Sequence, residues 1–267
     1  MVTAGPGGSP YDVPMPTVER FNLTPVKSTA LLHPHAIDLR PEGAVGDRRF
    51  LFVRANGERL SGETKAPLMN IGSTYDVDEE HLTLRFPDGT TASGGSASFG
   101  EPRTVRLYDR EVPARRVDPL FTEAIRTVNG DDRLELLRVD EPEYAGGIDR
   151  VSIVSRASVD DLGHRGGVDE LDSRRFRMLI EITDAEPFEE DTWAGRRIRF
   201  GDAVVKVGDP MPRCVVTTLN PDTAKKDFPT LEILASYRKR GKELLFGMYG
   251  EVEVAGDVSV GDRVEPI

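Results

Sequence analysis

The stretch RRIRFGDAVVKVGDPMPRC, residues 196–214, has the pattern of two β-strands joined by a tight turn. Apolar side chains alternate with polar ones in the manner of strands that bury one face. Gly201 and Asp202 lie between the two arms, and both residue types favour turns. The second arm runs through GDPMPR to Cys214, so we expect this cysteine to lie at the end of a strand.

Strand patterns of the same kind recur on both sides of this stretch. They are VERFNL (18–23), RRFLFV (48–53), HLTLRF (81–86), TVRLY (104–108), DRVSIVS (149–155), RFRMLIEI (175–182), LLFGMYGEVEV (244–254) and VSVGDRVEPI (258–267). Many short strands with few helices favour barrel-like packing over a doubly wound sheet. The predicted fold class is therefore α+β and mainly β, with β-barrel-like domains and a few helices.

Helical patterns occur in only a few places. Residues 119–128 carry apolar side chains at helical spacing and end near Asn129-Gly130. Ser158 precedes an acidic residue by three positions, which predicts an N-cap. Residues 229–241 give the strongest pattern, with a proline at the start, basic residues near the end and a glycine as the expected stop.

Composition narrows the classes of protein to which the chain can belong. The 267 residues carry a net charge of −11, which disfavours nucleic acid as a partner. No apolar run approaches the ~20 residues that span a bilayer, so we expect no membrane insertion. A single cysteine excludes an intrachain disulfide and a cysteine-ligated iron–sulfur cluster, and fits the reducing cytoplasm. Residues 1–16 are rich in glycine and proline, and we expect a flexible leader.

Three stretches contain residues suited to an anion. PVKST (25–29) offers a lysine, two hydroxyls and loop N–H groups, the components of an oxyanion or phosphate site. GDRRF (46–50) and SRRFR (173–177) contribute arginines. If residues 175–182 form a strand, Arg175 and Arg177 point to the same face. The alternatives are a solvated lysine and a charged edge strand paired with carboxylates.

Cys214 is open to two interpretations. A lone cysteine is commonly a small buried apolar residue. Its position after a turn-forming segment and beside Arg213 favours the other interpretation, an accessible thiolate.

Taken together, these stretches resemble the MOSC proteins, named for the C-terminal domain of molybdenum-cofactor sulfurase. The resemblance covers residues 16–266 and is most specific around MPRCVVTTLNPDT (211–223). It implies an N-terminal β-barrel domain at residues 17–115 and a MOSC domain at 116–267, as in the group that includes the amidoxime-reducing components. The other matching stretches are VERFNLTPVKST, GAVGDRRFLFV, SIVSRASVDDL, SRRFRMLIEI, PFEEDTWAGRRIRFGD, TLEILASYR and LFGMYGEVEVAGDVSVGD.

The resemblance implies a molybdenum–molybdopterin cofactor with Cys214 as catalytic residue and molybdenum ligand, a role that suits a soft thiolate. It implies a reductase of small N-hydroxylated or related N–O and S–O substrates that takes electrons from an external donor protein. It also carries the family's association with pyridoxal phosphate binding. The residues that it implies for cofactor binding are Lys27, Ser28, Arg48, Arg49, Ser61, Lys65 and Arg177.

Two positions depart from the family pattern. Leu179 follows RFRM where many members have an asparagine after RFRP, and Asn220 stands where an aspartate is usual. These departures leave open a binding protein of the same fold without a cofactor. The resemblance itself leaves open a second alternative, a sulfur carrier with a persulfide on Cys214.

Overall fold

The computed structural model describes residues 15–54, 66–95, 99–107, 110–117, 121–124, 126, 134–140 and 151–267. Its largest sheet runs in the order β1 (Thr17–Phe21), β12 (Ile180–Thr183), β11 (Val151–Ser155), β16 (Glu243–Val254), β14 (Ala203–Pro212), β13 (Arg197–Phe200) and β18 (Val264–Pro266). A short strand, β15 (Lys239–Arg240), pairs with β16. Neighbours are antiparallel except for β11 and β12. The described chain is mainly β, as the sequence predicts.

This sheet closes almost completely into a barrel. Val18 N–H donates to Asp262 O at 2.9 Å, and Val264 N–H donates to Pro16 O at 2.8 Å, so the first strand meets the segment before the last. The interior is apolar and is filled from every strand that lies along the sheet path from β1 to β18. The barrel therefore combines residues from the two ends of the described chain.

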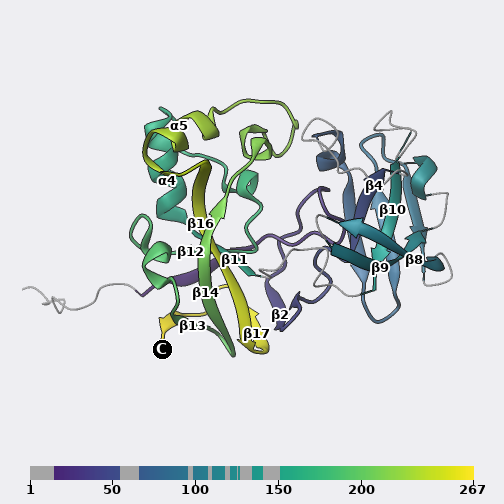
Figure 1. The fold of residues 1–267 in the computed structure, drawn as a ribbon, viewed down its shortest axis with the longest axis horizontal. Helices are drawn as coiled ribbons and strands as arrows, with labels where there is room; N and C mark the ends of the chain where they lie inside the picture. Colours follow the sequence, from purple (N-terminus) through teal and green to yellow (C-terminus); the bar gives the residue numbers. More distant parts are fainter. Residues whose placement is uncertain are drawn as a thin grey trace, which may run out of the picture.

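Three smaller sheets complete the β-structure of the described residues. The first has the order β4 (Phe50–Arg54), β10 (Leu134–Val139), β9 (Arg110–Val117) and β8 (Phe99–Leu107). The second contains β5 (Gly72–Asp76), β6 (His81–Arg85) and β7 (Thr91–Gly94), and the third contains β17 (Gly256–Ser259), β2 (Ala36–Arg40) and β3 (Gly43–Ala44). Strands β4, β8, β9 and β10 lie together beside the barrel (Figure 1). Phe50 of β4 and Leu134 of β10 pack with Leu82 of β6 in a separate apolar cluster.

Short helices cover the barrel ends and connect the strands. Helices α4 (Arg156–Arg165) and α5 (Thr230–Tyr237) pack against each other at one end of the barrel (Figure 1). The 3-10 helices within the described ranges are η1 (Ala66–Asn70), η3 (Ser173–Phe176), η4 (Glu189–Trp193) and η5 (Val215–Thr218). Within the described part of the chain, no helix is long and apolar enough to cross a membrane.

The strand–turn–strand prediction for residues 196–214 is confirmed. Strands β13 and β14 pair with Ile198 opposite Val205 and Phe200 opposite Ala203. Gly201 has φ +52°, a left-handed conformation that glycine adopts without a steric cost. Predicted strands at 18–23, 48–53, 81–86 and 149–155 also match observed strands within a few residues.

Three local predictions need correction. Residues 175–182 do not form one strand: η3 ends at Phe176, Arg177 is left-handed with φ 55°, and β12 begins only at Ile180. Ser155, not Ser158, caps α4, because its Oγ accepts the N–H of Ser158 at 3.1 Å. Helix α5 ends at Tyr237, since the basic residues that follow pair with β16 as β15.

Two other predictions lie wholly or partly outside the described residues. Of the predicted helix at 119–128, residues 121–124 and 126 are described, and they are helical. The expected leader at residues 1–16 lies outside the described part except for Met15 and Pro16.

The buried carboxyl of Glu190 in η4 predicts a pH-dependent stability. Burial raises its pKa, although its Oε1 accepts the Ser155 N–H at 3.2 Å. A raised folded-state pKa means that the folded protein loses stability as the pH rises above 4.5, the ordinary pKa of the group. We expect Glu190→Gln to increase the free energy of unfolding at pH 8 and to change it little at pH 4. Urea denaturation at both pH values measures this, and a larger gain at pH 4 would contradict it.

Candidate functional site

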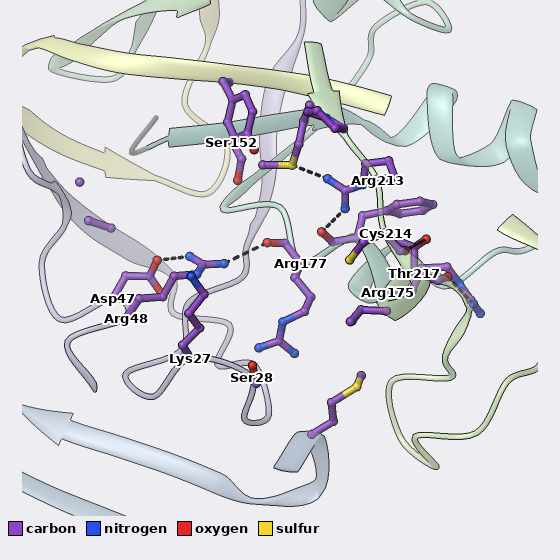
Figure 2. Close-up of a pocket in the computed structure, with 18 of the residues that line it drawn as sticks. Lys27, Ser28, Asp47, Arg48, Ser152, Arg175, Arg177, Arg213, Cys214 and Thr217 are labelled. Carbon is purple, nitrogen blue, oxygen red and sulfur yellow. Dashed lines mark hydrogen bonds and ion pairs between the residues drawn. The ribbon is translucent and has the colours of Figure 1, made fainter. Parts of the chain in front are cut away.

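A cavity of about 260 Å³ opens where the barrel meets the loops that lead to the second β-structure. Figure 2 shows that its walls come from segments far apart in the sequence. The polar and sulfur-bearing residues that line it are Lys27, Ser28, Glu42, Asp47, Arg48, Met69, Ser152, Arg175, Arg177, Met211, Arg213, Cys214, Thr217 and Tyr249. Cations outnumber carboxylates in this wall, although the whole chain has a net charge of −11.

Cys214 presents an accessible thiol to the cavity. It lies between the end of β14 and the start of η5, with extended backbone geometry at φ −122° and ψ 176°. Its carbonyl accepts the N–H and the hydroxyl of Thr217, which fixes the backbone. Its side chain makes no capping hydrogen bond and is exposed. Its sulfur points into the cavity (Figure 2), so the buried-thiol alternative does not hold.

The neighbouring Arg213 places a buried positive charge beside this thiol. Its guanidinium donates to Met178 Sδ at 3.2 Å and to Met211 Sδ and Phe176 O. Burial lowers the pKa of Arg213 to about 10, so it stays protonated at neutral pH. The buried Nε of Arg213 has no hydrogen-bond partner. No carboxylate of the described residues forms an ion pair with the Arg213 guanidinium. The cavity therefore carries an unbalanced cation near the sulfur.

Arg177 supplies a second cation at the centre of the cavity (Figure 2). Its guanidinium donates to Thr29 O at 2.6 Å, while its own carbonyl accepts from Arg48 Nη2 at 3.2 Å. Burial and the nearby charge of Arg48 lower its pKa to about 10. Arg48 is paired with Asp47, whose Oδ1 accepts the N–H of Thr24 at 2.8 Å.

A network of buried hydroxyl groups shapes the PVKST loop. Thr29 is fully buried, and its hydroxyl contacts Thr24, Ser73 and Val26 O at 2.8–2.9 Å. Lys27 N–H donates to Phe50 O at 2.8 Å, which ties the loop to β4. This arrangement leaves the side chains of Lys27 and Ser28 at the cavity wall.

The backbone at the cavity is unusually strained. Among the described residues, seven non-glycine positions have positive φ, and three of them, Ser28, Arg48 and Arg177, line the cavity. Such conformations cost free energy and persist only where the surrounding structure holds them, typically at functional sites. The strain supports a ligand-binding role for this wall.

The structure brings five residues predicted from the sequence around one cavity: Lys27, Ser28, Arg48, Arg177 and Cys214. Arg49 is placed elsewhere. Its guanidinium reaches Asp140 O at 3.4 Å, and burial together with the charge of Arg138 lowers its pKa. Ser61 and Lys65 lie outside the described residues.

Arg175 borders the same cavity, but its guanidinium holds the structure around Cys214 together. The side chain is 3% exposed and donates to Asp227 Oδ1 at 3.1 Å and to Thr217 O at 3.2 Å. The prediction that Arg175 and Arg177 share one strand face is wrong, because η3 ends between them and Arg177 is left-handed.

The two departures from the family pattern lie outside the cavity wall. Leu179 is buried in the barrel core, and its N–H donates to Ser152 Oγ at 2.9 Å. Asn220 shapes the loop after η5: its Nδ2 donates to Asp227 Oδ2 at 2.8 Å, and its Oδ1 accepts the Asp222 N–H at 2.9 Å. Neither side chain is among those that line the cavity.

Arg213, Glu42 and Ser152 are cavity residues that the sequence did not identify as members of a site. Arg213 had a signal, because it directly precedes the only cysteine. Glu42 and Ser152 had none, since each lies in an ordinary turn or strand and reaches the cavity only through tertiary packing.

Because the Arg175 guanidinium holds three groups around Cys214, we expect truncation of this side chain to destabilise the protein. Arg175→Met leaves the carbonyls of Thr217 and Leu219 without this donor and Asp227 without its ion-pair partner. We expect the free energy of unfolding to fall by about 2–3 kcal/mol. Urea denaturation measures this, with Arg197→Met as the control because that exposed pair with Glu253 contributes under about 1 kcal/mol. Equal losses in the two variants would contradict the assignment.

Comparison with known proteins gives a consistent result. The family model described as "MOSC N-terminal beta barrel domain" matches residues 15–123. The family model described as "MOSC domain" matches residues 142–265. Mitochondrial amidoxime reducing component 2 of Rattus norvegicus is 38% identical, over 93% of this chain and 82% of the relative. Mitochondrial amidoxime-reducing component 1 of Homo sapiens is 35% identical over the same shares. Molybdenum cofactor sulfurase of Drosophila grimshawi is 28% identical over 88% of this chain, which spans 32% of that relative.

Proposed function

The chain belongs to the MOSC family and carries that family's N-terminal β-barrel domain, and from this premise we propose that it is a molybdenum-dependent reductase. The proposed cofactor is molybdenum–molybdopterin, held in the cavity at Cys214. The proposed substrates are small N-hydroxylated or related N–O and S–O compounds. The names of the amidoxime-reducing relatives support this reaction class over the alternatives.

One observation carries the proposal: the cavity combines an exposed thiol with cations that lack carboxylate partners among the described residues. Cys214 offers the soft sulfur ligand that suits a metal of this kind. Arg177 and Arg213 have no carboxylate ion pair in the described part of the chain, and the Arg213 Nε is buried without a partner. A phosphorylated, anionic cofactor would satisfy both requirements.

The basic residues of the cavity have separate tasks in this proposal. Lys27, Ser28 and Arg177 would hold the phosphate group, and Arg48 would fix the Arg177 backbone through its carbonyl. Arg213 would offset negative charge next to Cys214. The bound cofactor would supply the two-electron chemistry that removes oxygen from the substrate. Because this chain has a single cysteine, the electrons would come from an external donor protein.

The test is metal and pterin analysis of the protein made in a host that synthesises the cofactor. We expect close to one molybdenum and one pterin for each chain, with the pterin detected by its fluorescence after oxidation. Protein that contains neither would overturn the proposal.

A sulfur-carrier role is the second candidate, because the exposed Cys214 lies beside a cation and one relative is named a molybdenum cofactor sulfurase. In this case the Cys214 thiolate would take the outer sulfur of a donor protein's persulfide, breaking the donor's S–S bond and releasing the donor as a thiol, and no metal would be needed. Mass spectrometry of the intact chain distinguishes the two. A gain of one sulfur atom that a thiol reductant reverses would support the carrier role.

A further inference from the structure

The cavity has a second polar wall that the proposed function does not use. Glu42 lies just before β3, and Ser152 and Tyr249 are directly opposite each other on the neighbouring strands β11 and β16. Ala44 packs in the same apolar cluster as Val151 and Met248, the residues next to Ser152 and Tyr249. The turn that carries Glu42 is therefore anchored in the same apolar core as β11 and β16.

The hydrogen-bonding capacity of this wall differs from that of the cationic wall, which is formed by Lys27, Arg48, Arg177 and Arg213. Glu42 is exposed, and none of the described residues forms a hydrogen bond or an ion pair with its carboxylate. Asp47, the other carboxylate of the cavity, is already engaged by Arg48 and by the N–H of Thr24. Ser152 Oγ accepts the Leu179 N–H at 2.9 Å, which leaves the hydroxyl proton to be donated. The wall therefore offers a two-oxygen acceptor and a hydroxyl donor.

A 2-amino-4-oxopyrimidine edge is the chemical complement of this arrangement. Such an edge presents one carbonyl acceptor followed by two adjacent N–H donors. A carboxylate accepts two parallel N–H groups in a bidentate pair, and a hydroxyl satisfies the carbonyl. The cationic wall cannot take this edge, since arginine and lysine side chains have no acceptor.

We propose that Glu42 is the residue that recognises the aminopyrimidinone edge of the pterin, with Ser152 donating to its carbonyl. This inference rests on the proposed function and adds a specificity-determining residue to it. The cationic wall and Cys214 would then hold one end of the ligand. Glu42 would select the other end by the ligand's pattern of N–H donors.

The test changes the hydrogen-bonding pattern of the protein at residue 42 and, separately, that of the ligand edge. Glu42→Gln replaces a two-acceptor group by one acceptor and one donor, which fits a 2,4-dioxo edge instead of a 2-amino-4-oxo edge. The probes are 6-hydroxymethylpterin phosphate and its 2,4-dioxo (lumazine) counterpart, titrated by fluorescence into metal-free protein. We expect the wild-type protein to prefer the pterin by roughly tenfold or more, as loss of a charge-assisted hydrogen bond implies. The Glu42→Gln variant should lose or reverse this preference.

Glu232→Gln is the matched control, because Glu232 lies exposed on α5 and is not among the cavity residues. A Glu42→Gln variant that keeps the wild-type preference would overturn the inference. A second measurement compares pterin that co-purifies with wild-type protein and with Glu42→Ala. Equal retention would also overturn it, whereas a wild-type protein without pterin would overturn the proposed function itself.

Discussion

Cys214→Ser is expected to lower the molybdenum content of the purified protein at least tenfold and to abolish reductase activity. Serine keeps the size of the side chain but replaces a soft sulfur ligand by a hard hydroxyl. The fold should tolerate the change, because the thiol is exposed and makes no capping hydrogen bond. We expect the free energy of unfolding to change by less than about 1 kcal/mol. Metal analysis, reductase assays and urea denaturation of the same preparations measure all three effects.

Thr218→Val is the control for this experiment. Thr218 lies four residues further on in η5 and donates its hydroxyl to Val215 O at 2.7 Å, without lining the cavity. This variant should keep its molybdenum. A Cys214→Ser protein that retains the metal would remove Cys214 from the proposed ligands. A variant that loses only a reversible sulfur mass, in a protein that never held metal, would favour the carrier role.

The strands were the most predictable part of the fold. Alternation of apolar and polar residues is a local signal, and it located β13 and β14 on either side of Gly201-Asp202. Closure of the barrel had no local signal, because it depends on Val18 meeting Asp262 across the length of the chain. Residues 175–182 misled the prediction for a related reason: their apolar content resembles a strand, but tertiary contacts impose a helical turn and a left-handed Arg177.

The site followed the same division between local and tertiary signals. Lys27, Arg48 and Cys214 lie in short motifs with recognisable chemistry, and the structure brings them to one cavity. Arg49 lies one residue from Arg48, yet its guanidinium reaches Asp140 O, because the left-handed turn at Arg48 sends the two side chains in different directions. Glu42 reaches the cavity only because the turn before β3 packs against the barrel.

The residues with left-handed backbone that line the cavity lower the stability of the folded protein, and we expect ligand binding to require this arrangement. Ser28, Arg48 and Arg177 are held in left-handed conformations, and two of the three are cations. Arg177 and Arg213 are desolvated strongly enough to lower the pKa of each to about 10. A depressed pKa for a base means that folding disfavours the charged form. Each charged guanidinium therefore lowers the free energy of unfolding, and this destabilisation is fully present below pH 10, where both the folded and the unfolded chain carry the charge. A bound anion would offset it.

Arg177→Met should therefore separate stability from binding. The variant removes a desolvated cation that is repelled by Arg48, and it loses one hydrogen bond to Thr29 O. Since replacement of buried charges by apolar groups is often stabilising, we expect the free energy of unfolding of the cofactor-free protein to rise by about 1 kcal/mol. The same variant should lose most of its co-purified pterin, because Arg177 is the central cation of the proposed phosphate site.

Arg174→Met, one helical turn away, is the control with the opposite expectation. Arg174 is already paired with Asp172 and Asp222, so its removal gains no relief from desolvation and should leave pterin binding unchanged. Thermal unfolding and pterin fluorescence on the two variants measure both quantities. An Arg177→Met protein that is less stable than wild type and still retains its pterin would show that this guanidinium is structural, since the charge would then contribute to the fold and not to the ligand.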